Sequence, residues 1–314
     1  MKIFDWNKIS SRKKKLLREE KTIFILGPVH ISKKRIKDIC KLYKGNILFG
    51  CLKDTEIPGL EDSLHFKLLL EEDLIQGLKR VKKANLLKHF HKDTKYIIKE
   101  LEPKKVIFIN GSWSGPLHYR SMYWKAIDRK AEVDIISAFV GEEEAREYQK
   151  KIYKERIKPG ELYSKRKKYA DKELLVLAQK LSCYSWDWIG QIAAVLAKKG
   201  KVLALAWNRV LPYEAFQMYD GAPRERMQIP SQEKLETQLT NHAESEILET
   251  CRRECINMKD TFLYINIFPC PICAKNLSQT DIKGIIYSHD HNLSNDIGYK
   301  ILEAEGKILK RIVI

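Results

Sequence analysis

Short hydrophobic runs recur along the first half of the chain and are bounded by Gly, Asn or Lys. Such runs are typical of buried strands, and they fall at 22–27, 46–50, 105–110 and 132–136. Helical patterns lie between them, at 31–43, 64–83, 117–129 and 141–157. Strands that alternate with helices predict an α/β domain with a mainly parallel, Rossmann-like sheet over residues 22–157. The basic residues 1–21 are predicted as an N-terminal arm or short helix.

The second half has a different pattern, because two strands follow one another directly. A helix at 170–186 is followed by strands at 191–198 and 201–207, which the turn Lys199-Gly200 joins as in a hairpin. After a polar insertion at 209–239, three helices alternate with three strands. The helices are predicted at 240–256, from PCPIC to 279, and at 296–304; the strands are predicted at 261–267, 283–287 and 308–313. Residues 170–314 therefore form a second predicted domain, and the Pro-Gly and charge run at 158–169 is the predicted linker.

The net charge of +17 is distributed unevenly along the chain. Residues 1–150 carry 32 Lys and Arg against 21 Asp and Glu, and residues 151–200 carry 12 against 5. Residues 201–314 carry 14 against 15 and are almost neutral. A basic protein invites a nucleic-acid partner, but the excess lies in the first domain and the junction. A solvated lysine-rich surface is the simpler interpretation.

Nothing in the sequence predicts a membrane protein or a secreted one. The chain has no run of 18 or more apolar residues, and its N-terminus lacks the apolar stretch and cleavage site of a signal peptide. Without a secretion signal the cysteines are expected to be reduced thiols. These are Cys40, Cys51, Cys183, Cys251, Cys255, Cys270 and Cys273. We expect a cytoplasmic protein with no membrane partner, and a homo-oligomer.

The clearest chemical signal is a split motif near the C-terminus. His242-Ala243-Glu244 is followed by Pro269-Cys270-Pro271-Ile272-Cys273. One imidazole and two thiolates supply three ligands for a tetrahedral Zn²⁺ and leave the fourth position for water. Both halves of the motif are predicted at helix N-termini, where the helix dipole favours a thiolate. Glu244 is predicted as the catalytic group that moves protons for that water, which zinc makes more acidic.

Other sites could be built from parts of this motif. A lone CxxC could be a redox pair or half of a structural zinc site. A structural site needs a fourth protein ligand, for which Cys251 and Cys255 are candidates. Both are predicted on the helix of His242 but further along it, so we expect them to face the core.

The C-terminal half resembles the deoxycytidylate (dCMP) deaminase family of the cytidine deaminase-like superfamily. The resemblance rests on NHAESEIL at 241–248, TFLYINIFPCPICAKNL at 261–277 and DIKGIIYSHD at 281–290. It implies a three-layer α/β/α domain with a mixed sheet, and a zinc-dependent enzyme that converts dCMP to dUMP and ammonia. Phe268 before the PCPIC segment is common in dCMP deaminase-like proteins, where tRNA adenosine deaminases carry glutamate. The resemblance therefore favours a free pyrimidine nucleotide as the substrate.

The same resemblance suggests which residues contact the substrate. Asn208 follows a strand in a segment like the family's GYN, and would contact the sugar or base. The backbone around Ala243 and the residue Phe268 would shape the base pocket. Arg224 and Arg226, in a stretch like Gly-Asp-Pro-Arg, are candidate phosphate partners, although a solvated loop explains them equally well. Departures from the family pattern are Trp207, Ala222 and Asn266.

Two alternative functions remain open. The chain could deaminate RNA or single-stranded DNA held by its basic half, or it could be a non-catalytic zinc-binding nucleotide sensor. The first domain has no dinucleotide fingerprint and no P-loop, so its role is uncertain. Its strand-to-helix turns at 27–30 and 111–116 are predicted at strand carboxyl ends, where ligands bind in parallel sheets. The pairs His89/His91 and His289/His291 could hold a second metal, but such pairs in polar loops are usually not ligands.

Overall fold

The computed structural model describes every residue except 28–29, 44, 58, 80, 82–83, 111–124, 189, 222–238 and 291–294. The chain divides into two compact units. Unit 1 contains Met1–Tyr153 and Ala215–Leu239, and unit 2 contains Lys154–Glu214 and Thr240–Ile314. Within the described ranges, we find no helix with the length and hydrophobicity needed to cross a membrane.

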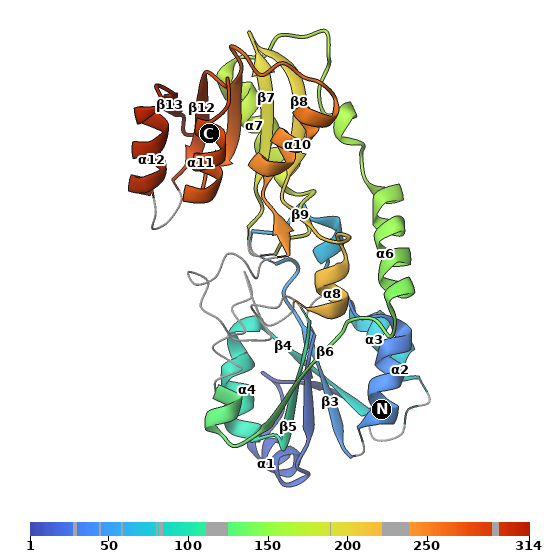
Figure 1. The fold of residues 1–314 in the computed structure, drawn as a ribbon. Helices are drawn as coiled ribbons and strands as arrows, with labels where there is room; N and C mark the ends of the chain where they lie inside the picture. The colour runs from blue at the N-terminus through green and yellow to red at the C-terminus, as the bar shows by residue number, and fades with distance from the viewer. Residues whose placement is uncertain are drawn as a thin grey trace. The chain divides into compact units, whose positions relative to one another are not determined.

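Unit 1 is built on a six-stranded parallel sheet with the order β1-β4-β3-β2-β5-β6, which confirms the predicted α/β class (Figure 1). Its strands are β1 (Ile3–Asp5), β2 (Ile23–Leu26), β3 (Ile47–Leu52), β4 (Ala84–His89), β5 (Lys105–Ile109) and β6 (Glu132–Ile136). Its helices are α1 (Ser11–Glu19), α2 (Lys33–Leu42), α3 (Glu71–Leu78), α4 (Thr94–Leu101) and α6 (Glu142–Glu155), with 3-10 turns η1 (Leu64–Phe66) and η2 (His91–Asp93). The direction of winding changes between β2 and β5, so unit 1 is doubly wound.

The N-terminal residues 1–21 are part of this unit and not a separate arm. β1 pairs with β4, with Ile3 opposite Leu86. α1 buries Leu17 and packs against α4. The ammonium group of Lys14 lies 2.9 Å from Glu100. Hydrophobic burial and an ion pair therefore fix a segment that its positive charge alone predicted to be an arm.

The sequence did not predict β4 and α4. For β4, the reason is that its hydrophobic pattern is incomplete. In β4, polar side chains such as Asn85 and Lys88 interrupt the hydrophobic run. Lys88 is nevertheless accommodated in the strand because its ammonium group reaches the carboxylate of Glu71 at 2.5 Å. His89 is buried edge-on to Phe24, with Nδ1 3.0 Å from the carbonyl of Phe90.

The insertion between the two halves of unit 2 contributes one helix to unit 1, so the predicted second domain is not continuous. This helix is α8 (Phe216–Asp220). The Ala138 N–H, after β6, donates to the carbonyl of Met218 at 3.1 Å. The Asn110 amide, after β5, donates to the carbonyl of Tyr219 at 3.0 Å. Gly221 ends the helix with φ +80, and a Cβ there would lie 2.9 Å from Asn110 Oδ1. α8 thus contacts the residues that follow β5 and β6, whereas the turn 111–116, predicted as a ligand position, lies outside the described residues.

Unit 2 is a mixed five-stranded sheet with the order β13-β12-β11-β7-β8. Its strands are β7 (Ala193–Lys198), β8 (Lys201–Trp207), β11 (Phe262–Ile267), β12 (Gly284–His289) and β13 (Ile308–Arg311), with a separate ribbon of β9 (Arg209–Val210) and β10 (Thr240–Asn241). Its helices are α7 (Asp171–Ser182), α10 (Ala243–Arg253), α11 (Pro271–Ser278) and α12 (Asn295–Ala304), with the turn η4 (Pro159–Glu161). α7 covers one face and α10, α11 and α12 cover the other (Figure 1). This confirms the predicted three-layer α/β/α domain.

The predicted linker 158–169 is folded onto unit 2. Tyr169 donates its backbone N–H to the carbonyl of Gly200 at 2.9 Å. Leu162 and Tyr163 pack with it against the core under α7. The chain therefore joins unit 2 at Lys154, before the Pro-Gly signal that predicted the boundary.

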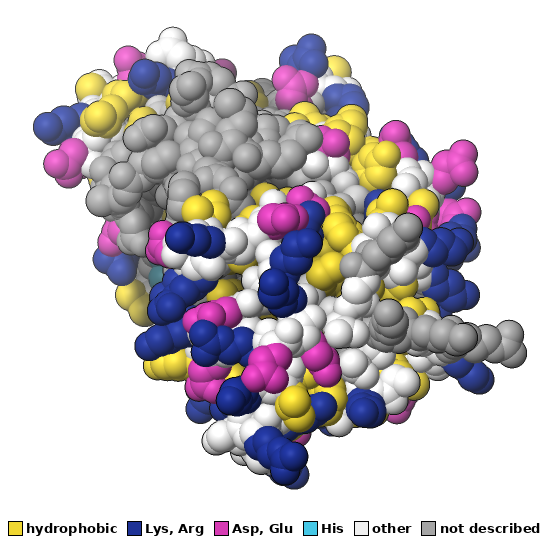
Figure 2. Space-filling view, turned by 90° about the horizontal axis from the view of Figure 1, so that it is seen from below, with side chains coloured by type: hydrophobic (Ala, Val, Ile, Leu, Met, Phe, Trp, Pro, Cys, Tyr) yellow, Lys and Arg dark blue, Asp and Glu magenta, His cyan; other side chains and the backbone are white. Residues whose placement is uncertain are grey.

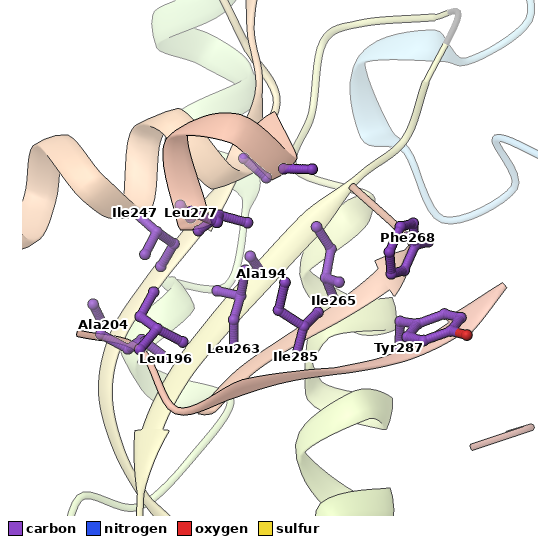
Figure 3. Close-up of a cluster of buried hydrophobic side chains, with 14 of the residues drawn as sticks. Ala194, Leu196, Ala204, Ile247, Leu263, Ile265, Phe268, Leu277, Ile285 and Tyr287 are labelled. Atoms are coloured by element: carbon purple, nitrogen blue, oxygen red, sulfur yellow. The ribbon is translucent and has the colours of Figure 1, made fainter. Parts of the chain in front are cut away.

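The core on the other face of the sheet brings α10 and α11 together. Figure 3 shows Leu263 and Ile265 of β11 beside Ile247 of α10 and Leu277 of α11. Small side chains where each helix begins, such as Ala243 and Ala274, are completely buried. A helix can approach a sheet closely only where side chains are small, so the packing fixes the positions of both helix N-termini.

The buried His89 predicts a pH dependence of stability. Burial lowers the pKa of His89 from 6.5 to about 4. As pH falls below 6.5, the unfolded chain binds a proton that the folded chain does not. The free energy of unfolding should then decrease by up to about 1.4 kcal/mol per pH unit. Urea unfolding at pH 7 and pH 5 should show this decrease, and the variant His89→Gln should show less of it. An identical decrease in both proteins would contradict the assignment.

Candidate metal centre

The three candidate ligands lie at the beginnings of two helices in unit 2. His242 is the residue before α10, in extended conformation with ψ 151. Cys270 is the residue before α11, which it reaches from the carboxyl end of β11. Pro271 occupies the first helical position, where its fixed φ suits the helix and its missing N–H removes no hydrogen bond. Cys273 follows in the first turn, so one turn presents both sulfur atoms.

The distances between the ligand atoms fit a zinc ion. His242 Nδ1 lies 3.6 Å from Cys270 Sγ and 3.5 Å from Cys273 Sγ. Tetrahedral zinc, with Zn–S bonds of about 2.3 Å and Zn–N bonds of about 2.0–2.1 Å, separates nitrogen and sulfur ligands by about 3.6 Å. In the described part of the chain, these three residues are the one group of three or more potential metal ligands. The donor set and its spacing therefore suit Zn²⁺.

Electrostatics at the site favour a bound cation. The Cys273 thiol donates to the sulfur of Cys270 and holds the pKa of Cys270 well below that of an ordinary thiol. The same sharing raises the pKa of Cys273. The hydrogen bond to Cys270 raises the pKa of His242 as well. The two sulfurs thus share one proton beside an imidazole that holds another, and a bound Zn²⁺ would take the place of these protons.

Glu244 lies in the first turn of α10 and is not a member of the ligand group. Its side chain is 3% exposed, and its Oε2 has no hydrogen-bond partner among the described residues. Burial raises the pKa of Glu244 to about 6. A carboxyl group with this pKa can both accept and release a proton near neutral pH.

Asn208 joins α10 to the segment before β7. Its amide nitrogen donates to the carbonyl of Gly190 at 3.0 Å, and its Oδ1 accepts the N–H of Ala243 at 2.9 Å. The side chain is 2% exposed. Asn208 and Ala243, both predicted to contact the substrate, thus lie next to each other. The Oδ1 of Asn208 and the N–H of Ala243 are hydrogen-bonded to each other.

Asn266 also holds the segment at the start of β7, by two hydrogen bonds of its side chain. Its Oδ1 accepts the N–H of Ala193 at 3.0 Å, and its amide donates to the carbonyl of Gln191 at 2.8 Å. The sequence identified Asn266 as a departure from the family pattern and gave it no role. The signal was a polar side chain near the end of the otherwise apolar strand FLYINI, because a buried amide requires partners.

Phe268 lies in the core of unit 2, where it is 1% exposed. Its ring stacks on Tyr299 with centroids 4.1 Å apart and meets the edge of Tyr287 at 4.9 Å. Figure 3 shows the Phe268 and Tyr287 rings side by side. In this structure the ring packs β12 and α12 and presents no open face.

Several predicted residues lie outside the ligand group. Cys251 is buried in the core and Cys255 is exposed at the end of α10. Neither described part of the two HxH pairs forms a group of three ligands. Arg224, Arg226 and His291 lie outside the described residues.

Comparisons with known proteins agree with this site. Residues 168–289 match the family model of the cytidine and deoxycytidylate deaminase zinc-binding region, so unit 2 carries a deaminase-family domain. No curated protein matches the chain.

Solved structures with a similar fold include the dCMP deaminase of cyanophage S-TIM5. Its apo form is 19% identical, covers 45% of this chain and 96% of its own, and has a TM-score of 0.33. The same enzyme with dCMP and dUMP is 19% identical, covers 45% and 95%, and has a TM-score of 0.35. The guanine deaminase of Bacillus subtilis is 19% identical, covers 42% and 76%, and has a TM-score of 0.27.

Removing one sulfur ligand should remove the metal. We expect the purified chain to contain about one zinc ion, and Cys270→Ala to contain less than about a tenth of that, because two protein ligands do not make a tight site. Elemental analysis by mass spectrometry measures both. Cys255→Ala is the matched control, since this exposed thiol should leave the zinc content unchanged. Full zinc content in Cys270→Ala would refute the site.

Asn208→Ala should destabilise unit 2. The variant leaves the N–H of Ala243 and the carbonyl of Gly190 without their partner, which should cost roughly 2–5 kcal/mol in free energy of unfolding. Thermal and urea unfolding measure the change. Asn257→Ala, which removes one exposed hydrogen bond from the N–H of Lys259, is the control and should have a smaller effect. Equal free energies of unfolding for the two variants would show that the hydrogen bonds of Asn208 do not stabilise unit 2.

Proposed function

We propose that this chain, whose residues 168–289 match the cytidine and deoxycytidylate deaminase zinc-binding region, hydrolyses the amino group of a free cytosine nucleotide. The substrate we favour is dCMP, which would become dUMP and ammonia. One observation carries the proposal: His242, Cys270 and Cys273 form a group spaced to hold zinc, and Glu244, two residues after His242 in the first turn of α10, is a buried carboxylate with an unsatisfied oxygen.

The residues divide the chemistry between them. His242, Cys270 and Cys273 would hold Zn²⁺, which lowers the pKa of a coordinated water toward 7. Glu244 would take the proton of the attacking water and give it to the ring nitrogen of cytosine. Glu244 would then take the remaining proton from the hydroxyl group added to the ring carbon and pass it to the amino group, so that the carbonyl of uracil forms as the C–N bond breaks and ammonia leaves. The raised pKa of Glu244, caused by burial, suits both directions of transfer.

The choice of a free nucleotide rests on the surroundings of the motif. Residues 201–314 carry almost no net charge, whereas an enzyme that holds a polynucleotide over its active site needs cations along the strand. Asn208 would keep the first turn of α10 in place for base recognition. Arg224 and Arg226 remain candidates for the phosphate on sequence grounds, and Phe268 would support the pocket from the core.

Glu244→Gln is the direct test of the proton-transfer role. The variant keeps the size of the side chain but cannot accept a proton, so turnover of dCMP should fall by about 10²–10⁴-fold while zinc content stays the same. Ammonia release and the ultraviolet change on conversion of cytosine to uracil measure turnover.

Glu246→Gln is the matched control, because Glu246 lies in the same turn but accepts from Asn241 at 2.7 Å. It should retain most activity. A panel of dCMP, CMP, deoxycytidine and dAMP identifies the substrate. Full turnover by Glu244→Gln would contradict proton transfer by Glu244. No turnover of any cytosine compound by the zinc-loaded chain would contradict the proposed deaminase function.

A further inference from the structure

A group of exposed cations lies at the end of unit 2 opposite the zinc ligands. We call it the basic end, and its members are Lys165, Arg166, Lys167, Lys168, Lys172, Lys199 and Lys201. They come from the segment before α7, from the first turn of α7 and from the β7–β8 hairpin. β7 starts beside Asn266 near the metal centre and ends at Lys198. Its six residues, at about 3.3 Å each, separate the two ends by roughly 17–20 Å.

Backbone contacts hold these segments together. The N–H of Tyr169 donates to the carbonyl of Gly200 at 2.9 Å. A Cβ at Gly200 would lie 2.7 Å from the carbonyl oxygen of Tyr169 and 3.5 Å from the Lys168 side chain, and φ there is +78. Only glycine permits this approach. The cations of the two segments are thus neighbours because of the fold.

Most of these cations have no acidic partner. Lys167 pairs with Glu173 at 2.7 Å. Among the described residues, the other six members of the basic end have no carboxylate within 4.0 Å. α1 of unit 1 differs, because Lys14, Lys15 and Arg18 each have a glutamate partner. Figure 2, which views the side where α1 lies, shows Lys and Arg mixed with Asp and Glu. The cations of the basic end are therefore less often paired than those of α1, where three of the five have a carboxylate within 4.0 Å.

A pocket adjoins the basic end. Its volume is about 250 Å³, and its lining is Leu162, Tyr169, Lys172, Glu173, Val176, Leu177 and Lys180. Apolar side chains form part of the lining, and Lys172 and Lys180 place two ammonium groups beside them. Pockets for whole small ligands are about 300–1,000 Å³. The volume of this one suits a single group the size of a base and not a whole nucleotide, and the carboxylate of Glu173 in its lining is paired with Lys167.

We propose that the basic end binds single-stranded nucleic acid, with phosphates on the unpaired lysines and one base in the pocket. Bases of a single strand expose faces that pack on aromatic and apolar side chains, whereas a duplex hides them. The strand would be held roughly 17–20 Å from the metal centre by the strand length above, so it is a docking partner and not the group that is deaminated. The inference does not depend on the proposed function.

The test uses the full, zinc-loaded chain and a fluorescein-labelled 20-nucleotide oligo(dT). Fluorescence anisotropy gives the dissociation constant at several salt concentrations. Lys168→Gln/Lys172→Gln/Lys199→Gln should weaken binding at least tenfold at low salt. It should also reduce the slope of log affinity against log salt by about 2, which is about 0.7 for each lost phosphate contact.

Two control measurements separate a site from net charge. Lys15→Gln/Lys21→Gln/Lys37→Gln removes the same three charges from unit 1 and should leave the affinity and slope unchanged. Val176→Asp should weaken binding through the pocket, whereas Val176→Ala should not. Turnover of dCMP by the basic-end variant should equal that of the unchanged chain.

Four results would overturn the proposal. They are no binding by the unchanged chain at low salt, equal weakening in the two triple variants, equal affinity for a duplex of the same length, and stronger lysine-dependent binding to anionic phosphatidylserine vesicles than to oligo(dT). The dCMP assay is read separately, so loss of the deaminase hypothesis would leave the oligonucleotide result intact.

Discussion

The structure of unit 2 depends on one constraint: two helices must begin close enough for His242 to meet Cys270 and Cys273 at 3.5–3.6 Å. These residues are far apart in the sequence, so the fold must supply the proximity. β11 delivers Cys270, and Asn208 fixes the N–H of Ala243 beside His242. The apolar core under α10 and α11 then holds both helices against the same face of the sheet.

The buried carboxylate of Glu244 is the feature that a purely structural site would not need. A buried acceptor without a partner destabilises the folded state by about 1–3 kcal/mol. Exceptions to hydrogen-bond satisfaction are expected at functional sites. The unsatisfied Oε2 of Glu244 is therefore the part of the structure that most strongly separates a deaminase hypothesis from a zinc-binding module.

The sequence predicted the elements that depend mainly on residues close together in the chain. The strands β5 and β8 were expected within a residue of their observed bounds, because each is an apolar run that follows a lysine. β6 was expected at its observed bounds although it carries Glu132 and Asp134. β1 and β4 were missed, since one has three residues and the other carries Lys88 and His89. The group of His242, Cys270 and Cys273, which the structure brings together, was recognisable from residue type and spacing. The roles of Asn266 and Phe268 were not, because they depend on partners distant in sequence. The assignment of α8 to unit 1 could not be predicted either, because it too depends on contacts with residues distant in sequence.

The structure was also needed to interpret the positive charge of the chain. The sequence showed an excess in the first domain and at the junction. In the structure three of the five cations of α1 have a glutamate partner, whereas one of the four at 165–168 has one. Assembly into a homo-oligomer and a cytoplasmic location remain predictions from the sequence.

The most direct measurement of the central claim is X-ray absorption at the zinc edge of the metal-loaded chain. A site of His242, Cys270 and Cys273 with an open position predicts two sulfur neighbours at about 2.3 Å and two nitrogen or oxygen neighbours at about 2.0–2.1 Å. Three or four sulfur neighbours would show that Cys251 or Cys255 closes the site. The zinc would then be structural, and the account given for Glu244 would be wrong.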